Sequence, residues 1–112
     1  MGETLGDLQQ LALLAALRLG AEAYGAEIQQ ELERTAGRAL TLSTVYVTME
    51  RLERRGYVRS WLGDATPVRG GKPKRYYALT APGLAALRQA REEMTRMWRG
   101  LESHPAFQQR TR

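Results

Sequence analysis

Residues 41–58, TLSTVYVTMERLERRGYV, and residues 59–79, RSWLGDATPVRGGKPKRYYAL, decide how this chain folds. The first stretch predicts a short helix, because apolar side chains recur in it at spacings of three and four residues. The second stretch predicts two strands, 57–62 and 75–79, joined by a glycine-rich loop with turn signals at Gly63-Asp64 and Thr66-Pro67. A helix is therefore followed directly by a β-hairpin.

Positive charge is concentrated in the same stretch. Between Arg51 and Arg75 lie eight of the 17 lysines and arginines but two of the 12 acidic residues. The other nine basic and ten acidic residues nearly cancel, so the formal net charge of +5 originates in this segment. A local excess of this kind is typical of a surface that binds a polyanion. A helix followed by a basic hairpin suits duplex DNA, since the helix can enter the major groove while the loop contacts the backbone.

Length and composition set the broad class. A chain of 112 residues with 43% hydrophobic residues is expected to form one folded domain. The sequence contains no cysteine, which excludes disulfides and thiolate metal sites and is consistent with a reducing cytoplasm. The apolar run from Leu11 to Leu17 is too short to span a bilayer, so no membrane association is expected.

The rest of the chain predicts three more helices, two before the helix of residues 41–58, which is thus the third, and one at the end. The first covers about residues 5–19 and the second about 24–35, with Gly20 and Gly37 at their ends. The third helix is capped by Thr41 or Ser43, and the last runs from Thr80 to about residue 101. The order helix, helix, helix, strand, strand, helix predicts a mainly α fold with a small β-hairpin (α+β), the winged helix-turn-helix. We expect a DNA-binding domain over residues 1–80, a dimerisation helix over 81–102 and a flexible tail over 103–112.

The third helix is expected to have an inner and an outer face. Leu42, Val45, Met49 and Leu52 are predicted to form the inner stripe. Tyr46, at the edge, either donates its hydroxyl to a phosphate or packs under the helix. Arg51 is the best candidate for reading guanine. The candidate DNA-binding residues are Ser43, Thr44, Tyr46, Val47, Thr48, Arg51 and Arg55 on this helix, and Arg69, Lys72, Lys74 and Arg75 on the hairpin.

The first and last helices carry more apolar surface than one small domain can cover. Residues 84, 87, 91, 94, 98 and 101 of the last helix follow an a/d pattern that only Arg91 interrupts. A second copy of the chain is the expected partner for this surface. The candidate dimer-interface residues are Leu8, Leu11, Leu14, Leu84, Leu87, Met94, Trp98 and Leu101.

The chain resembles the PadR family of bacterial transcriptional regulators. The resemblance covers about residues 5–101 and rests on the leucine-rich first helix and on four strings that follow it in order: Ala23-Tyr24-Gly25-Ala26-Glu27-Ile28, Ser43-Thr44-Val45-Tyr46, Leu52-Glu53-Arg54-Arg55-Gly56-Tyr57-Val58 and Arg75-Tyr76-Tyr77-Ala78-Leu79-Thr80. The short branch of the family, which this chain is similar to in size, implies a homodimer joined through the first and last helices. It also implies a repressor released by a small molecule.

The sequence departs from the family pattern at three places. Leu42 stands where a proline is common, and Val47 stands where a longer polar side chain is common. Met94 occupies the place of a tryptophan that binds flat aromatic drugs in some short members, and Trp98 follows one turn later. Met94 and Trp98 are therefore the candidate effector-pocket residues.

Two other functions are weighed beside DNA-binding regulation. One is a winged-helix module that binds a protein and not DNA, which a hairpin of mixed charge would favour. The other is an enzyme, which the sequence does not favour. It has a single histidine, His104 in the tail, and neither a phosphate-loop pattern nor a recognisable pair of catalytic carboxylates. We expect no metal, no cofactor and no catalytic residue.

Overall fold

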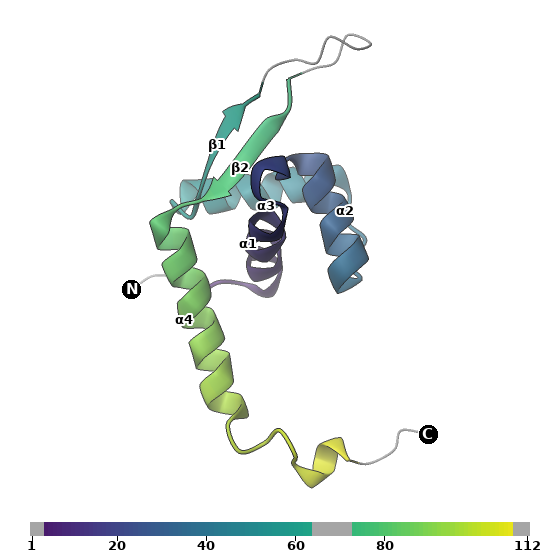
Figure 1. Ribbon diagram of the computed structural model, residues 1–112, viewed down its shortest axis with the longest axis vertical. Helices are drawn as coiled ribbons and strands as arrows, with labels where there is room; N and C mark the ends of the chain where they lie inside the picture. Colours follow the sequence, from purple (N-terminus) through teal and green to yellow (C-terminus); the bar gives the residue numbers. More distant parts are fainter. Residues whose placement is uncertain (1–3, 64–72, 109–112) are drawn as a thin grey trace.

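Figure 1 shows the arrangement of four helices and one hairpin in a computed structural model, which describes residues 4–63 and 73–108. The elements are α1 (Asp7–Leu19), a 3₁₀ turn (Gly20–Glu22), α2 (Gly25–Ala36), α3 (Leu42–Arg54), β1 (Val58–Leu62), β2 (Arg75–Leu79), α4 (Ala81–Trp98) and a second 3₁₀ turn (Pro105–Phe107). The predicted order of elements and the α+β class are confirmed. The predicted bounds differ from the observed ones by at most three residues.

The first three helices pack around one core. Its largest fully buried side chains are Leu13 of α1, Ile28 of α2, and Val45, Met49 and Leu52 of α3. Burying a side chain of this size stabilises the fold by about 1.5–3 kcal/mol. These residues recur at helical spacing in the sequence, so the same pattern that predicts the helices also places their inner faces.

The two strands form an antiparallel hairpin that is anchored to the start of α2. Val58 pairs with Leu79 at the end next to α3 and α4, and Leu62 pairs with Arg75 at the end next to the loop. These paired strands are the hairpin base, as distinct from the loop. The backbone N–H of Tyr77 donates to the carbonyl oxygen of Ala23 at 2.9 Å, and Tyr24 forms a β-bridge with Tyr76. Residues 20–24 therefore act as a short third edge for the sheet. These contacts fix the base of the hairpin against the helical body.

The last helix begins in contact with the body and then leaves it. The Thr80 hydroxyl caps α4 by accepting from the Gly83 N–H at 3.1 Å, as predicted, and donates to the Gly56 carbonyl at 2.6 Å. Further along, every residue from 91 to 108 is exposed. Figure 1 shows α4 projecting away from α1, α2 and α3. A helix of 18 residues is about 27 Å long, so much of its surface has no cover from its own domain.

The first part of the predicted tail, residues 103–108, contains a turn that contacts the end of α4. The helix ends at Trp98 rather than near Leu101, and Gly100 adopts a φ of 85° where the backbone turns. The rings of Phe107 and Trp98 then lie 5.3 Å apart. His104, the only histidine of the sequence, accepts at Nδ1 from the Ala106 N–H at 3.0 Å. Residues 103–108 therefore form a turn that packs on the end of α4, whereas residues 109–112 lie outside the described part of the chain.

Glu31 is a buried charge on the inner face of α2, where an acidic side chain is not expected. It is only 7% exposed. Its carboxylate accepts from Thr35 at 2.7 Å, from Arg18 at 2.8 Å and from Arg34 at 2.6 Å. These hydrogen bonds, with that from Thr35 the largest influence, lower the pKa of Glu31 from 4.5 to about 2. The ionised side chain therefore ties α2 to α1.

Across residues 4–63 and 73–108, none of the helices has both the length and the apolar character needed to cross a membrane.

Candidate nucleic-acid interface

The start of α3 is fixed by a threonine cap. The side-chain oxygen of Thr41 accepts from the Thr44 N–H at 3.1 Å, and the two threonine hydroxyls lie 2.9 Å apart. Of the two predicted caps, Thr41 is therefore the one used, and Ser43 is left exposed in the first turn. The cap satisfies one of the N–H groups that a helix start leaves without a partner.

Two residues of α3 lie on the opposite face from the one predicted. Thr48 was expected to face outward, but it is only 8% exposed. Its hydroxyl donates to the Thr44 carbonyl at 2.8 Å, which satisfies the polar atom and allows burial. Leu42 was expected in the inner stripe, but it is 36% exposed. It is the first residue of α3, so the core does not extend far enough to cover it. The prediction that Thr48 faces outward is therefore wrong.

The inward turn of Thr48 moves the outer face of α3. The stripe that points directly away from the core consists of Ser43, Val47, Glu50 and Arg54, at spacings of four, three and four residues. All four side chains are exposed. The sequence prediction missed Glu50 and Arg54. The missing signal was the chemistry of Thr48, because a threonine that bonds to its own helix can replace an apolar residue in a buried stripe.

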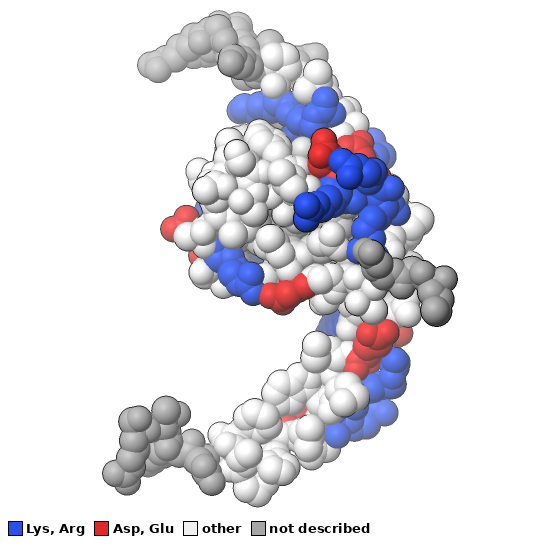
Figure 2. Space-filling view, turned by 180° about the vertical axis from the view of Figure 1, so that it is seen from behind, with Lys and Arg blue, Asp and Glu red and all other residues white. Residues whose placement is uncertain are grey.

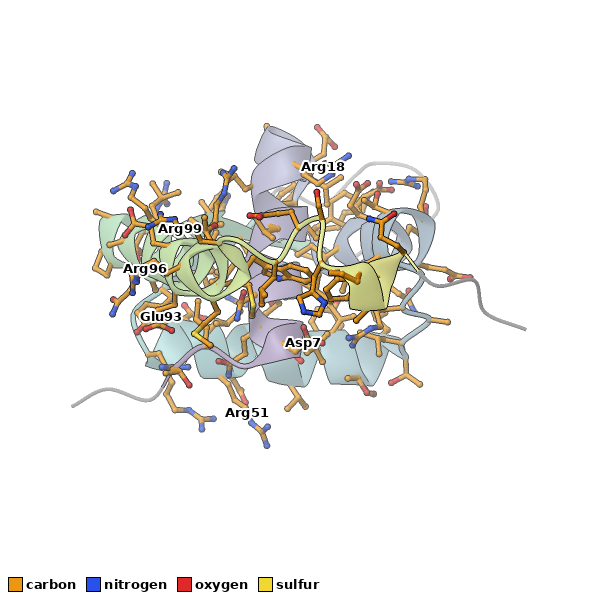
Figure 3. All side chains as sticks on the ribbon, turned by 90° about the horizontal axis from the view of Figure 1, so that it is seen from below. Asp7, Arg18, Arg51, Glu93, Arg96 and Arg99 are labelled. Atoms are coloured by element: carbon orange, nitrogen blue, oxygen red, sulfur yellow. The ribbon has the colours of Figure 1, made fainter. Side chains whose placement is uncertain are left out.

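The remaining candidates on α3 flank this outer stripe. Arg51 is exposed, and Figure 3 shows its side chain pointing away from the body of the protein. Thr44 is half-buried beside its cap. Arg55 instead turns inward, where its guanidinium donates to Gln9 of α1 at 2.6 Å and lies 4.8 Å from the centre of the Tyr57 ring. Arg51 is thus placed for an external partner, whereas Arg55 joins α3 to α1.

Tyr46 packs against the first turn of α2. A Cβ added at Gly25 would lie 2.6 Å from the ring of Tyr46, so the glycine makes room for the aromatic side chain. The ring nevertheless remains 41% exposed. Packing, one of the two predicted roles, is observed, and contact of the Tyr46 hydroxyl with a phosphate stays a prediction.

The base of the hairpin holds its cations in defined contacts. Arg75 donates to the Ser60 hydroxyl at 2.9 Å, and that hydroxyl contacts both carboxylate oxygens of Glu53 at 2.8 and 2.9 Å. The Lys74 ammonium lies 4.4 Å from the centre of the Tyr24 ring. These contacts link β1 and β2 to α3 and to the start of α2. Arg69 and Lys72 of the predicted hairpin tip, with its turn signals from Asp64 to Pro67, lie outside the described residues.

A second group of ring contacts stiffens the outer side of the hairpin. Trp61 stacks on Tyr76 with ring centres 6.1 Å apart, and the Arg59 guanidinium lies 4.7 Å from the centre of the Trp61 ring. Trp61 therefore packs within the hairpin. Arg59 is exposed, so its positive charge lies at the surface.

The charges gather on one side of the molecule. Figure 2, which views the molecule from behind, shows most blue side chains along one side, with red side chains among them, and a smaller mixed group on the opposite side. The basic residues of the nearby elements are Arg51, Arg54, Arg55 and Arg59, with Lys74 and Arg75 at the hairpin base, and the acidic residues of α3 are Glu50 and Glu53. The surface is basic but not uniformly so.

A cavity of about 670 Å³ lies between the start of α2, α3 and the hairpin base. Its lining includes Tyr24, Tyr46, Glu50 and Lys74. The carboxylate of Glu50 and the ammonium of Lys74 thus approach the same cleft from different elements. Burial at the inner side of this region raises the pKa of Tyr77. The cleft separates the outer stripe of α3 from the hairpin.

The candidate dimer-interface residues fall into two groups. Leu11 and Leu87 pack against the core of their own domain, and Leu8 is partly buried. The others are exposed: Leu14 43%, Leu84 41%, Met94 58%, Trp98 43% and Leu101 42%. The exposed group is spread over α1, α4 and the turn after α4, and these apolar side chains are open to solvent in the described part of the single chain.

The two candidate effector residues do not share one cavity in the single chain. Met94 lines a cavity of about 440 Å³ between α4 and the segment before α1, together with Leu5, Tyr57, Ala90 and Met97. Trp98 instead packs on Phe107. Among the residues that the structure describes, no group of three or more histidine, cysteine or acidic side chains is arranged to hold a metal ion.

Three packed helices, of which the third has one face exposed, and an adjoining hairpin define a winged helix-turn-helix protein. The model of the PadR-like family of transcriptional regulators matches residues 13–89. The chain therefore belongs to the PadR-like family of transcriptional regulators, which are DNA-binding proteins.

Solved structures and a sequence relative agree with this assignment. A PadR family transcriptional regulator from Eggerthella lenta is 29% identical, with a TM-score of 0.66 over 88% of each chain. A transcriptional regulator from Clostridium thermocellum has a TM-score of 0.67 over 87% of this chain and 88% of its own, at 22% identity. An uncharacterised protein from Lysinibacillus sphaericus is 30% identical over 89 residues, 78% of this chain and 75% of the relative.

Proposed function

We propose that this chain binds specific operator sequences as a homodimer and represses transcription until a small aromatic effector releases it. The observation that carries the proposal is the exposed outer face of α3 beside the base of the hairpin. A helix of 13 residues is about 20 Å long, which is long enough to lie along several base pairs of a major groove. We place this activity in the cytoplasm.

Two kinds of DNA contact follow from the positions of the side chains. Ser43, Val47 and Arg51 face outward from α3 and are proposed to reach base edges, where Val47 can contact a thymine methyl group. The hairpin cations Lys74 and Arg75, with Arg69 and Lys72, are proposed to contact phosphates. Phosphate contacts supply most of the affinity, and base contacts supply the choice of sequence.

The proposed dimer is supported by the exposed apolar surface of α1 and α4. Leu14, Met94 and Trp98 are at least 43% exposed. A two-fold dimer would cover the same surface on both copies. Two recognition helices related by such an axis are expected to meet half-sites about one helical turn, roughly 34–36 Å, apart.

The proposed effector response depends on the position of α4. The cavity lined by Met94 has a volume of about 440 Å³, within the usual range of about 300–1,000 Å³ for small-molecule sites. It lies between α4 and the body of the domain, so a flat aromatic molecule bound there would change the angle of α4. That angle would set the separation of the two recognition helices in the dimer.

One selection experiment tests the regulatory function. The immobilised full-length chain is incubated with fragments of the host genome, and retained duplexes are sequenced at two salt concentrations. We expect a two-fold-symmetric element in front of a gene, and a log K that falls with log salt by about 0.9 per neutralised phosphate. Retention of unrelated fragments alone would exclude an operator-specific regulator.

A module that binds a protein rather than DNA is the second candidate function. The acidic side chains Glu50 and Glu53 at the α3 face favour it, because they reduce the positive potential there. Weak duplex binding that does not change with salt would support this alternative.

A further inference from the structure

Glu50 occupies the centre of the outer stripe of α3. Its neighbours in the stripe are Val47 one turn before and Arg54 one turn after. The Glu50 and Arg54 side chains are 68% and 72% exposed, and the Arg54 guanidinium donates to the Glu50 carboxylate at 3.1 Å. If α3 enters a groove, this carboxylate enters it as well.

The other acidic residue of α3, Glu53, has a partner on a different element, whereas the partner of Glu50 is on its own helix. Glu53 accepts from the Ser60 hydroxyl, which also accepts from Arg75, so it holds the hairpin against the helix. Glu50 contacts an exposed arginine of its own helix. An exposed pair of this kind stabilises a helix by a few tenths of a kcal/mol. Helix stability therefore gives a weak reason for a carboxylate at this position.

The chemistry of DNA restricts what a carboxylate can contact. Phosphates repel it, so Glu50 cannot serve as a backbone contact. In the major groove the donors are the N4 amino group of cytosine and the N6 amino group of adenine. Adenine places its N7 acceptor beside N6, which opposes a carboxylate. Cytosine presents its amino group without that neighbouring acceptor, and it is the better partner for glutamate.

We propose that Glu50 is a specificity-determining residue whose carboxylate accepts a hydrogen bond from the N4 amino group of a cytosine in the operator. This inference rests on the proposed DNA-binding function, and it adds one specific base contact to those proposed above. Arg54 acts as a positioning residue that orients the carboxylate. The net charge of the pair is zero, so Arg54 also reduces repulsion between Glu50 and the phosphates.

The test compares three forms of the full-length chain in selection from a random duplex library: wild type, Glu50→Gln and Glu50→Ala. The wild type should enrich cytosine at one position of each half-site. Glutamine prefers adenine, because it can donate to N7 while accepting from N6. Glu50→Gln should therefore move that position from cytosine to adenine, and Glu50→Ala should abolish the preference there. The change in relative affinity at this position should be roughly 5- to 150-fold.

Two further measurements separate base reading from a structural role. Both variants should bind non-cognate duplex at least as tightly as the wild type, because a negative charge has been removed from the DNA-facing surface. Both variants should also have the same melting temperature as the wild type. Glu92→Gln on the exposed surface of α4 makes the same charge change away from α3 and should leave the base preference unaltered.

The outcomes are distinct. Identical preferences in all three forms, adenine already preferred by the wild type, or uniform weakening on every duplex would each overturn the assignment of Glu50. A wild type that shows salt-dependent binding without the predicted shift would leave the DNA-binding function standing and reject only Glu50. A wild type that selects no duplex would reject both.

Discussion

Replacing Gly83 with alanine is expected to loosen the attachment of α4 to the winged domain. Gly83 is buried in the first turn of α4. A Cβ added there would lie 2.1 Å from the carbonyl oxygen of Tyr57 and 3.0 Å from its carbonyl carbon. The same oxygen accepts from the Thr80 N–H at 3.0 Å. Backbone atoms cannot swing aside as a side chain can, so either the helix or the preceding loop must move.

Two opposing effects determine how much Gly83→Ala changes the free energy of unfolding. Overpacking costs typically about 1–3 kcal/mol, and a 2.1 Å approach to backbone belongs at the upper end of that range. Alanine is favoured over glycine inside a helix by about 0.5–1 kcal/mol. The free energy of unfolding should therefore fall by about 2 kcal/mol. For a domain of this size the melting temperature should fall by roughly 8–16 °C.

Thermal and urea unfolding followed by circular dichroism measure this change. Ala85→Gly, at an exposed position in the same helix, is the matched control and should cost only about 0.5–1 kcal/mol. A Gly83→Ala variant that melts at or above the wild-type temperature would show that the close approach to Tyr57 does not limit this site.

Three more predictions concern DNA binding, pH and assembly. Arg51→Ala should relax the preference at one base position, whereas Lys72→Ala should weaken binding to all duplexes alike and reduce the salt slope by about one unit. Anisotropy titrations measure both effects. A changed base preference in Lys72→Ala would contradict the assignment of Arg51 to bases and Lys72 to phosphates. The pKa of Glu31 is lowered to about 2 from 4.5, so the stability that its ionised form contributes is present above pH 4.5 and is lost as the pH falls toward 2. Glu31→Gln should flatten urea-unfolding stability over that interval, and an unchanged pH profile would contradict the role of its hydrogen bonds. Trp98→Ala should shift the chain toward monomer in sedimentation at micromolar concentration, because Trp98 is an exposed aromatic in the proposed interface; an unchanged association constant would place the interface elsewhere.

Local sequence signals were sufficient for the positions of the elements. Thr41 and Thr80 cap α3 and α4, as hydroxyl side chains before a helical pattern predict. The strand from Arg75 to Leu79 has the predicted bounds. Each of these signals depends on neighbours within a few residues, which is why one sequence reveals it.

The outer face of α3 required the tertiary structure. A period of 3.6 residues fixes which side chains share a face, but the side on which Thr48 falls depends on what packs beside it. Its hydroxyl bonds to Thr44, so the residue fits the core and turns Glu50 and Arg54 outward. Glu31 shows the same limit, since the Arg18 that makes burial of this charge tolerable comes from another helix.

The sequence by itself determined the α+β class, the order of the elements and the basic character of the segment from Arg51 to Arg75, because periodicity, caps and charge are local properties. Only the tertiary structure decided which polar side chains are buried and which cations are already engaged. The physical reason is that burial of a polar group depends on partners that are distant along the chain. Those partners brought Glu31 and Thr48 inside, turned Arg55 toward Gln9 and left Glu50 at the surface.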